Sequence, residues 1–326
     1  MRFIHQTSTD PAFNLAAEEW LLRHTREDVF MLWRNAKAVI VGRNQNTISE
    51  INEAFVRKNG VSVIRRLTGG GAVFHDLGNI NFTIIALNND TETLDFQRFA
   101  KPVLAALQSM GIPCSFNGRN DLVIEDRKFS GNAQHLWKGR VLHHGTLLYA
   151  SKMEDLSGAL KIHPEKYRDK AVKSVRARVT NIASHLPESM EITEFMGRLM
   201  ARMAGEEGVR VENALSGEEI LAVNELAEEK YRSWDWNYGR SPAYAFAWRT
   251  RTPGGVLDVR MDVQDGVIQG IRIFGDYFGV RDVSELEDRL KGCRHDRIAL
   301  AERLQGVVLD DYFQHVEEET FLDCLF

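Results

Sequence analysis

The stretch VIRRLTGGGAVFHDLGN, from Val63 to Asn79, decides how this chain is interpreted. Three consecutive glycines, Gly69 to Gly71, follow a pair of arginines and a Leu-Thr step. The residues before the glycines are apolar and β-branched, and AVFH after them is also typical of a strand. We therefore expect a glycine-rich connection between two strands, where exposed backbone N–H groups can bind an anion.

Two well-known kinds of glycine loop do not match this stretch. A Walker-type loop needs a lysine and a hydroxyl residue directly after its glycines and then a helix, whereas Gly71 is followed by AVFHD. A dinucleotide-binding fingerprint also opens a helix, and its glycines are spaced as GxGxxG. The loop is therefore of another kind.

The arginine pair limits what this loop can bind. Arg65 and Arg66 are neighbours on a predicted strand, so they point to opposite faces and only one of them can easily face a ligand. A plain alternative is a glycine bulge in a hairpin that carries two surface arginines. The three glycines alone do not decide between these interpretations.

Two later stretches carry further candidate residues, GRNDLVIEDRKFSGNAQ (Gly118 to Gln134) and LHHGTLLYA (Leu142 to Ala150). The first places Lys128 after a charged turn at residues 125–127 and shortly before Gly131, which again exposes backbone. The second contains a pair of histidines. Taken singly, a lysine of this kind is most often solvated and a histidine is more often structural than functional.

The rest of the chain alternates between helical and strand-like patterns, which predicts an α+β fold of two domains, residues 1–240 and 241–326. The stretch WDWNYGRSPAYA, from Trp234 to Ala245, breaks the periodicity and is the expected linker. We expect helices at residues 13–25, 49–60, 95–111, 192–208, 216–233, 283–292 and 310–326. We expect paired strands at residues 28–35 and 36–44 and further strands at 61–66, 72–75, 80–87, 121–125 and 143–150. Residues 256–263 and 267–275 should form a hairpin around Asp265 and Gly266.

Composition excludes several classes of protein. With 326 residues, 44% hydrophobic and 27% charged, the chain can bury a sizeable core. Its formal charge of -5 gives no reason to expect a nucleic-acid partner, and no stretch approaches the roughly 18 apolar residues of a membrane span. Three widely separated cysteines predict neither disulfides nor a zinc site. We expect a cytoplasmic protein.

Taken together, these motifs resemble the lipoate-protein ligase family closely. The matching phrases are RRLTGGGAVFHDLGN, GRNDLV, RKFSGNAQ, HHGTLL and SVRARVTNI, in the order of the family, and the likeness continues through SWDWNYGRSP over essentially the whole chain. The resemblance implies a mixed-sheet catalytic domain of the biotin/lipoate ligase type, followed by a smaller α+β accessory domain. By this resemblance, the glycine loop binds the acyl-adenylate and the ATP from which it is made.

The resemblance also implies the chemistry. Enzymes of this family convert lipoate and ATP, with Mg²⁺, to lipoyl-AMP and then transfer the lipoyl group to a lysine of a lipoyl carrier. The implied carriers are the E2 subunits of 2-oxoacid dehydrogenases and the glycine cleavage H protein. The base that deprotonates the carrier lysine and the choice between lipoate and octanoate stay open.

Individual roles follow from the resemblance position by position. Lys128 is the catalytic residue, because a compact ammonium suits a moving point of charge between the carboxylate and the α-phosphate. Asp121 is a candidate contact of the Mg²⁺ that comes with the nucleotide. The implied ATP-binding residues are Arg66, Gly71, Ala72, Val73, Phe74 and Lys128, those that bind lipoate or the adenylate are Arg65, Gly70, His75, Lys128 and His144, and Leu15, Trp33, Val73 and Phe74 are candidates for the walls of an apolar tunnel.

Three alternatives remain at this stage. A lipoyl or octanoyl transferase of the same superfamily would use a pre-activated donor, although Cys114 lies outside the glycine block and gives little support to a thioester route. A biotin ligase would show a different glycine signature. A non-catalytic binding protein would have no need of the lysine and glycines.

Exposed basic residues such as Lys138 or Arg140 could attract an acidic carrier, but a solvated loop explains them equally well.

Overall fold

The computed structural model describes two compact units of the chain. Unit 1 consists of Met1–Arg43 and Phe55–Ser233, and unit 2 consists of Asn44–Ala54 and Trp234–Phe326. The described residues are 1–87, 94–118, 120–160, 179–205, 211–212, 215–277 and 279–326. The motif residues 174–178 lie outside them. Because residues 44–54 belong to unit 2, the chain passes between the units three times.

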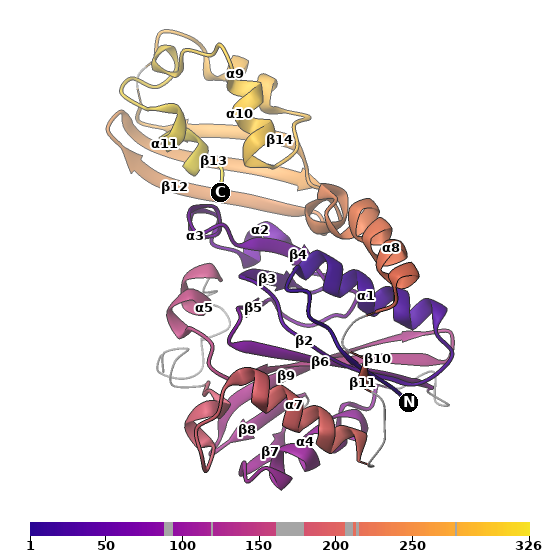
Figure 1. Ribbon diagram of the computed structural model, residues 1–326. Coiled ribbons are helices and arrows are strands. Elements are labelled where there is room, and N and C mark those ends of the chain that lie inside the picture. Colours follow the sequence, from indigo (N-terminus) through magenta and orange to yellow (C-terminus); the bar gives the residue numbers. More distant parts are fainter. Residues whose placement is uncertain (88–93, 119, 161–178, 206–210, 213–214, 278) are drawn as a thin grey trace. The chain divides into compact units, whose positions relative to one another are not determined.

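A large mixed sheet forms the centre of unit 1 (Figure 1). Strand β1 pairs in parallel with β2 and β11, and the other neighbours are antiparallel. The mixed sheet with helices on it confirms the predicted α+β class. Its strands are, in spatial order, β11 (Val211–Glu212), β1 (Arg2–His5), β2 (Val29–Trp33), β6 (Asn79–Leu87), β10 (Arg140–Leu148), β9 (Arg127–Trp137), β8 (Asp121–Ile124) and β7 (Cys114–Asn117).

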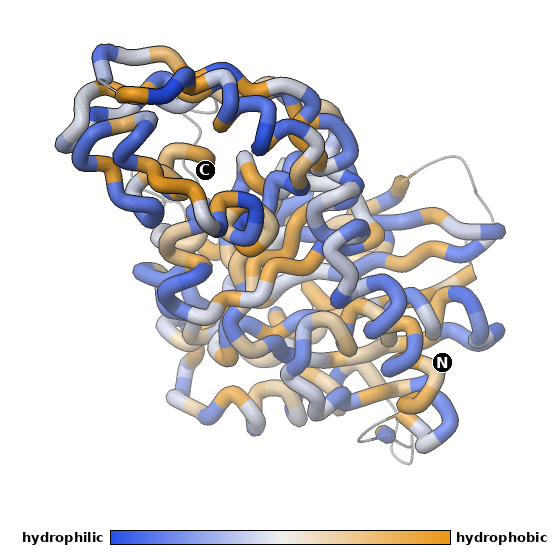
Figure 2. Tube along the Cα trace, turned by 90° about the horizontal axis from the view of Figure 1, so that it is seen from above, coloured by the Kyte–Doolittle hydropathy of each residue, from blue (hydrophilic) through white to orange (hydrophobic). Residues whose placement is uncertain are grey.

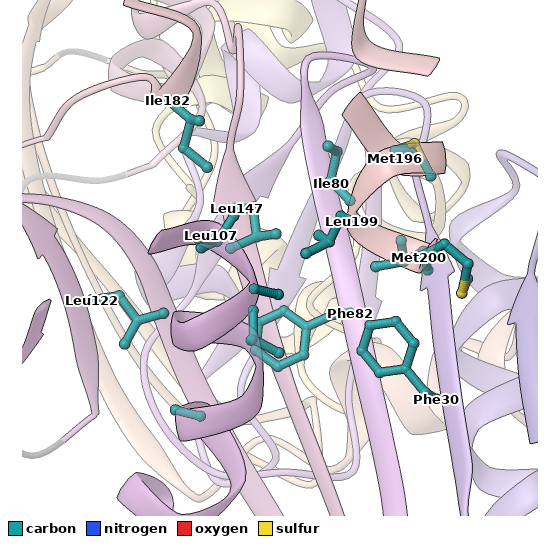
Figure 3. Close-up of a cluster of buried hydrophobic side chains, with 14 of the residues drawn as sticks. Phe30, Ile80, Phe82, Leu107, Leu122, Leu147, Ile182, Met196, Leu199 and Met200 are labelled. Carbon is teal, nitrogen blue, oxygen red and sulfur yellow. The ribbon is translucent and has the colours of Figure 1, made fainter. Parts of the chain in front are cut away.

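The two faces of this sheet carry different helices, as Figure 1 shows. Alternate residues such as Phe30 and Phe82 pack against helices α4 (Phe96–Ser109) and α7 (Ile192–Ala204), in the hydrophobic core of Figure 3. The residues between them face helix α1 (Pro11–His24) on the opposite side. The strands therefore need apolar residues on both faces, and β2 is buried throughout.

The glycine stretch joins two strands of a second, three-stranded sheet in unit 1. Its order is β4 (Ser62–Arg65), β3 (Ala38–Val41) and β5 (Val73–His75), so β3 lies between the two strands that the glycines connect. The stretch is therefore a crossover connection, and the hairpin alternative is wrong. The predicted pairing of β2 with β3 is also wrong, because these strands belong to different sheets.

Strand β9 is missing from the sequence prediction. Only Glu125 and Asp126, with φ of 50° and 62°, form the turn that we expected at residues 125–127, and the strand begins at Arg127. Its apolar and polar residues do not alternate regularly, because a bulge interrupts its pairing with β8 between Leu122 and Val123. The pattern is therefore not that of a simple strand.

Most helices of unit 1 follow the prediction. Asp10 caps α1, and Ser216 with Glu219 forms the expected capping box of α8 (Gly217–Leu226). Helix α4 continues past Pro102, although a proline inside a helix removes one of its backbone hydrogen bonds. The single helix expected at 49–60 is instead two short ones. These are α2 (Thr47–Glu50), which belongs to unit 2, and α3 (Glu53–Lys58), which begins in unit 2 and continues into unit 1. Unit 1 also contains α5 (Met153–Ala159), η2 (Ile182–His185) and η3 (Ala227–Tyr231).

Unit 2 contains an antiparallel sheet of β12 (Tyr244–Thr252), β13 (Gly255–Gln264) and β14 (Val267–Gly275). Asp265 and Gly266, with φ of 50° and 71°, form the predicted hairpin turn. Helices α9 (Val283–Leu290), α10 (Arg297–Leu304) and α11 (Glu318–Asp323) and the turn η5 (Leu309–Asp311) follow the sheet in the chain. Helix α10 was not predicted, and α11 is shorter than the helix expected at 310–326.

The predicted linker is wrong. Residues of the stretch from Trp234 to Ala245 form the helical turn η4 (Asp235–Gly239) and the beginning of β12, and all of them belong to unit 2. The chain enters unit 2 directly after Ser233. Glycine and proline here mark turns inside the unit, because Arg240 and Ser241 bond back to the helical turn through their backbone N–H groups.

Hydrophobic stretches alternate with hydrophilic ones along the coloured parts of the tube in Figure 2. Accordingly, among the residues that the structure describes, no helix has the length and apolar character that crossing a membrane requires.

Candidate active site

A cavity of about 170 Å³ lies in unit 1, on the face of the large sheet that carries α1. Most of the candidate residues from the sequence meet here, although they come from distant elements. The candidates that line the cavity are Arg66, Gly70, Gly71, Ala72, Val73, His75, Lys128 and His144, together with Leu15 and Trp33 from the expected tunnel. Asn81, Asn120, Gly131, Asn132, Ala133 and Thr146 also line it and were not singled out from the sequence as ligand contacts.

Arg66 shapes the glycine loop from inside. Its Nη2 donates to the carbonyl oxygens of Gly69 and Gly71 at 2.7 and 2.8 Å, and its Nε donates to Thr68 Oγ1 at 2.8 Å. Gly70 has φ of 92°, and a Cβ there would be 2.9 Å from Arg66 Nη2. Burial lowers the pKa of Arg66 to about 10, against the attraction of Glu18. The loop therefore wraps around a cation that stays charged at neutral pH.

Arg65 and Phe74 do not line the cavity. Arg65 points to the other face of its strand, where Nη1 donates to the carbonyl oxygens of Gly42 and Arg43 at 3.0 and 3.1 Å. The side chain of Phe74 is buried. As the strand alternation predicts, only Arg66 of the arginine pair faces the site.

Lys128 lies at the exposed part of the cavity and is paired with Asp121, Nζ to Oδ1 at 2.7 Å, with side chains 42% and 37% exposed. In a regular strand, Lys128 and Gly131 would point to opposite faces because their separation is odd. The bulge in β9 reverses this parity, and both residues line the cavity. A Cβ at position 131 would be 3.0 Å from Lys128 Nζ, so the glycine leaves room for the ammonium.

His144 is held by groups that no sequence motif indicated. Its Nδ1 is 2.9 Å from Glu18 Oε1, and its Nε2 is 2.8 Å from Thr68 Oγ1. Thr83 Oγ1 donates to the same Glu18 oxygen at 2.6 Å and accepts from Trp33 Nε1 at 2.8 Å. A buried polar chain thus connects α1, the large sheet and the glycine loop. These contacts span up to 126 positions of sequence, which explains why no local pattern shows them.

The neighbouring His143 points to the opposite face of the sheet. Its ring stacks with Phe82 and Phe99, and its Nδ1 is 2.8 Å from Gln134 Nε2. Burial lowers the pKa of His143 to about 3, with a smaller contribution from His144. His143 is therefore a neutral core residue, and His144 alone of the pair belongs to the cavity.

His75 faces the cavity from β5. Its Nδ1 is 3.1 Å from Asn35 Nδ2, and its Nε2 has no hydrogen-bond partner among the described residues. Burial, helped by the charge of Arg66 and by His144, lowers the pKa of His75 to about 3. The imidazole is therefore neutral at physiological pH.

The cavity thus has an exposed polar part at Lys128 and an enclosed, more apolar part. Leu15 and Trp33 are each 2% exposed and His75 is 3% exposed. This arrangement suits an acid whose carboxylate meets the lysine while its tail is buried.

The described residues offer neither a multi-ligand metal centre nor a reactive thiol in the cavity. They contain no cluster of three or more His, Cys, Asp or Glu side chains that could hold a metal ion, so Asp121 could supply only one ligand to an ion brought by a substrate. Cys114 is absent from the cavity lining, and burial raises the pKa of its thiol to about 11. A thioester route through Cys114 is therefore disfavoured.

Residues 10–204, which include the whole cavity, match the family model of the lipoyl protein ligase A/B catalytic domain. The chain belongs to the lipoate-protein ligase family. Residues 241–325 match the model of the bacterial lipoate protein ligase C-terminus. This family membership confirms the resemblance found in the motifs.

One relative of this family matches along the whole chain, and two solved structures match about three quarters of it. The lipoate-protein ligase LplJ of Bacillus subtilis is 40% identical over 331 residues, which cover 100% of both chains. A solved structure described as a bipartite lipoate protein ligase and its E2 lipoyl domain from Thermoplasma acidophilum has a TM-score of 0.65 and 29% identity, over 73% of this chain and 96% of that one. A lipoate-protein ligase A bound with ATP shares the fold, with a TM-score of 0.61 and 24% identity over 74% of this chain and 100% of that one.

Proposed function

We propose that the cavity of unit 1 is the active site of this ligase. As a member of its family, the chain is an enzyme that joins lipoate to protein at the expense of ATP. The observation that carries the proposed site is the position of Lys128, whose ammonium lies at the exposed part of a cavity with an enclosed apolar part, beside the glycine loop. The carboxylate of lipoate would meet Lys128, and its chain would extend towards Leu15 and Trp33.

In the first step, a carboxylate oxygen of lipoate attacks the α-phosphorus of ATP, and the bond to pyrophosphate breaks. Two anions must approach each other, so the site needs fixed positive charge and N–H donors around the α-phosphate. Lys128 would exchange its contact with Asp121 for the carboxylate and phosphate oxygens. Arg66 would hold the loop Gly71–Phe74 in the shape that binds ATP, and Phe74 would contribute backbone because its side chain is buried.

The remaining candidate residues have narrower roles in this proposal. Gly70 lets the loop pass close to the adenylate, and His144 and His75 line the part that receives the acyl group. Arg65 is left out, because its guanidinium is buried against the carbonyl groups of Gly42 and Arg43. Mg²⁺ would arrive with the nucleotide, held mainly by phosphate and water oxygens, with Asp121 as one carboxylate ligand.

In the second step, the neutral amine of a carrier lysine attacks the acyl carbon of lipoyl-AMP, the bond to AMP breaks, and the amine loses a proton. The mixed anhydride is reactive enough that no covalent enzyme intermediate is needed. We propose lipoyl domains of E2 subunits and the glycine cleavage H protein as carriers. Three free cysteines, all of them buried, agree with a cytoplasmic enzyme.

Arg140 does not take part in attracting a carrier. We expected this residue to be exposed, but it is 7% exposed and donates to backbone carbonyls at the end of α1. Lys138 lies at the exposed turn before β10, over the ring of Trp137.

Intact-mass measurement of a lipoyl domain incubated with the enzyme, lipoate, ATP and Mg²⁺ tests the complete reaction. We expect the mass of one lipoyl group to be added, and no addition when the acceptor lysine is replaced or ATP is omitted. Modification that requires supplied lipoyl-AMP and ignores ATP would contradict the proposal and would indicate a transferase instead.

A further inference from the structure

The hydrogen-bond roles of His75 are fixed by a chain of buried amides. Asn14 Nδ2 is within 3.0 Å of the carbonyl oxygens of Ser8 and Arg34, so this atom must be the donor nitrogen. The same nitrogen is 3.0 Å from Asn35 Oδ1, which leaves Asn35 Nδ2 to donate to His75 Nδ1 at 3.1 Å. With Nδ1 as acceptor, the neutral ring carries its proton on Nε2.

This Nε2–H group is a buried donor that faces the cavity without an acceptor. Among the described residues nothing accepts its proton, although His75 is almost fully buried. Asn81 Nδ2, in the lining of the same cavity, is a second buried donor without a partner among the described residues, while Asn81 Oδ1 accepts from Asn79 Nδ2. Buried donors are normally satisfied, so these atoms indicate that a ligand supplies an acceptor.

The position of His75 indicates which part of the ligand supplies the acceptor. Its ring contacts that of Trp33 edge to face, with 6.2 Å between the ring centroids, and Asn81 is the cross-strand neighbour of Trp33. These residues belong to the enclosed part of the cavity, whereas Lys128 lies at its exposed part. If Lys128 meets the carboxylate, His75 faces the tail of the acid.

The tails of the two candidate acids differ in hydrogen-bonding capacity. Lipoate ends in a dithiolane ring, and its two sulfur atoms are weak acceptors. Octanoate ends in a hydrocarbon chain, which would bury the N–H groups of His75 and Asn81 without any acceptor. A site that places a donor against a substrate group rejects an analogue without that group.

We propose that His75 donates its Nε2–H to a dithiolane sulfur and thereby makes the enzyme prefer lipoate to octanoate. This role rests on the proposed function of the cavity, and it makes His75 a specificity-determining residue. Because the donor is neutral and the acceptor weak, the preference in kcat/KM should be modest, about tenfold.

Pyrophosphate exchange with each acid tests this role in the wild type, His75→Phe and His75→Gln. Phenylalanine keeps a ring without a donor, and glutamine offers both an acceptor for Asn35 and a donor. We expect the ratio of kcat/KM for lipoate to kcat/KM for octanoate to fall about tenfold in His75→Phe, while His75→Gln keeps most of the preference. Circular dichroism and thermal unfolding of both variants show independently that they are folded.

An equal loss with both acids would overturn the role, because it would place His75 at the nucleotide or in the general structure. An unchanged ratio between the acids would overturn it as well. Calorimetric binding of lipoate and octanoate without ATP separates this inference from the proposed function. If the protein adenylates neither acid, the inference still requires it to bind lipoate more tightly than octanoate through His75. Equal binding of lipoate by the wild type and by His75→Phe contradicts the inference.

Discussion

At the scale of the residue, the position of the Lys128 ammonium depends on the missing side chain of Gly131. A methyl group at position 131 would be 3.0 Å from Nζ and 3.1 Å from Cε of Lys128. We predict that Gly131→Ala displaces the ammonium and lowers the rate of adenylation about tenfold or more, because small misplacements of a catalytic group are costly. Pyrophosphate exchange measures this effect.

Gly197 in α7 offers a matched control, because nothing lies within 4 Å of a Cβ built there. Gly197→Ala should leave exchange unchanged and slightly favour the helix. Equal activities of Gly131→Ala and the wild type would show that Lys128 does not need the space above Gly131.

The buried histidines predict how stability changes with pH. The pKa of His75 and that of His143 are both lowered to about 3 by burial, below the ordinary value of 6.5. As the pH falls below 6.5, the unfolded chain takes up protons that the folded chain does not, so the unfolded state becomes more stable relative to the folded state. Each histidine should lower the free energy of unfolding by about 1.4 kcal/mol per pH unit between pH 6 and 4.

Urea unfolding at several pH values checks this expectation in the wild type and in His75→Gln. The variant should lose less stability on acidification, since one of the two titrating groups has been removed. Identical pH slopes for the two proteins would contradict the assignment of a neutral, buried His75.

At the scale of the element, Arg140 on β10 fastens the carboxyl end of α1. Its Nη1 donates to Leu22 O at 3.1 Å and to Thr25 O, and its Nη2 donates to Glu27 O at 2.7 Å. The last carbonyls of a helix have no partner within it, and Arg140 satisfies that of the buried Leu22. It also binds the carbonyls of Thr25 and Glu27 in the chain that follows the helix.

Arg140→Leu should therefore lower the free energy of unfolding by about 2–4 kcal/mol, and Lys138→Leu at the exposed turn should change it by less than about 0.5 kcal/mol. Chemical denaturation measures both. Similar stabilities of the two variants would mean that the carbonyls at the end of α1 find water or other donors instead.

Much of the local structure could be predicted from the sequence, and the failures have physical causes. Helix α1 and the hairpin around Asp265 carry local signals, namely periodicity and turn residues with positive φ. The pairing of β3 with β4 and β5 depends on which strands meet in space, which no local pattern states. Strand β9 was not predicted for a similar reason, because the bulge that interrupts its alternation depends on its pairing with β8.

The candidate site shows the same division. Lys128, Arg66 and His144 were found through motifs of the family, and the structure brings them to one cavity. Glu18 and Thr68 were not found, because their importance lies in contacts with His144 across the fold. Sequence motifs named the groups that face the cavity, but not the groups that hold them in place.

At the scale of the whole molecule, the segment Asn44–Ala54 belongs to unit 2 although the chain before and after it belongs to unit 1. Ile48 is buried in the hydrophobic core of unit 2, and Thr47 Oγ1 donates to Asn237 O at 2.6 Å. We predict that Ile48→Ala raises hydrogen exchange in β13 and α9 and leaves β6 and β10 protected, because it removes about 2–5 kcal/mol of packing from unit 2.

Val103→Ala, in the core of unit 1, is the matched control. It should raise hydrogen exchange in β6 and β10 and leave β13 and α9 protected. Exchange that rises in β6 and β10 after the Ile48 substitution would contradict the assignment of this segment to unit 2.

We propose above that the cavity around Lys128 activates lipoate with ATP. Lipoate-dependent exchange of labelled pyrophosphate into ATP, without any carrier protein, tests it most directly in the wild type and in Lys128→Ala. We predict exchange that needs lipoate and falls at least about a hundredfold in the variant, because a positive charge at the α-phosphate is lost. Equal exchange by both proteins would contradict the role of Lys128, and no exchange by a folded wild type that transfers the acyl group from supplied lipoyl-AMP would contradict the activating function.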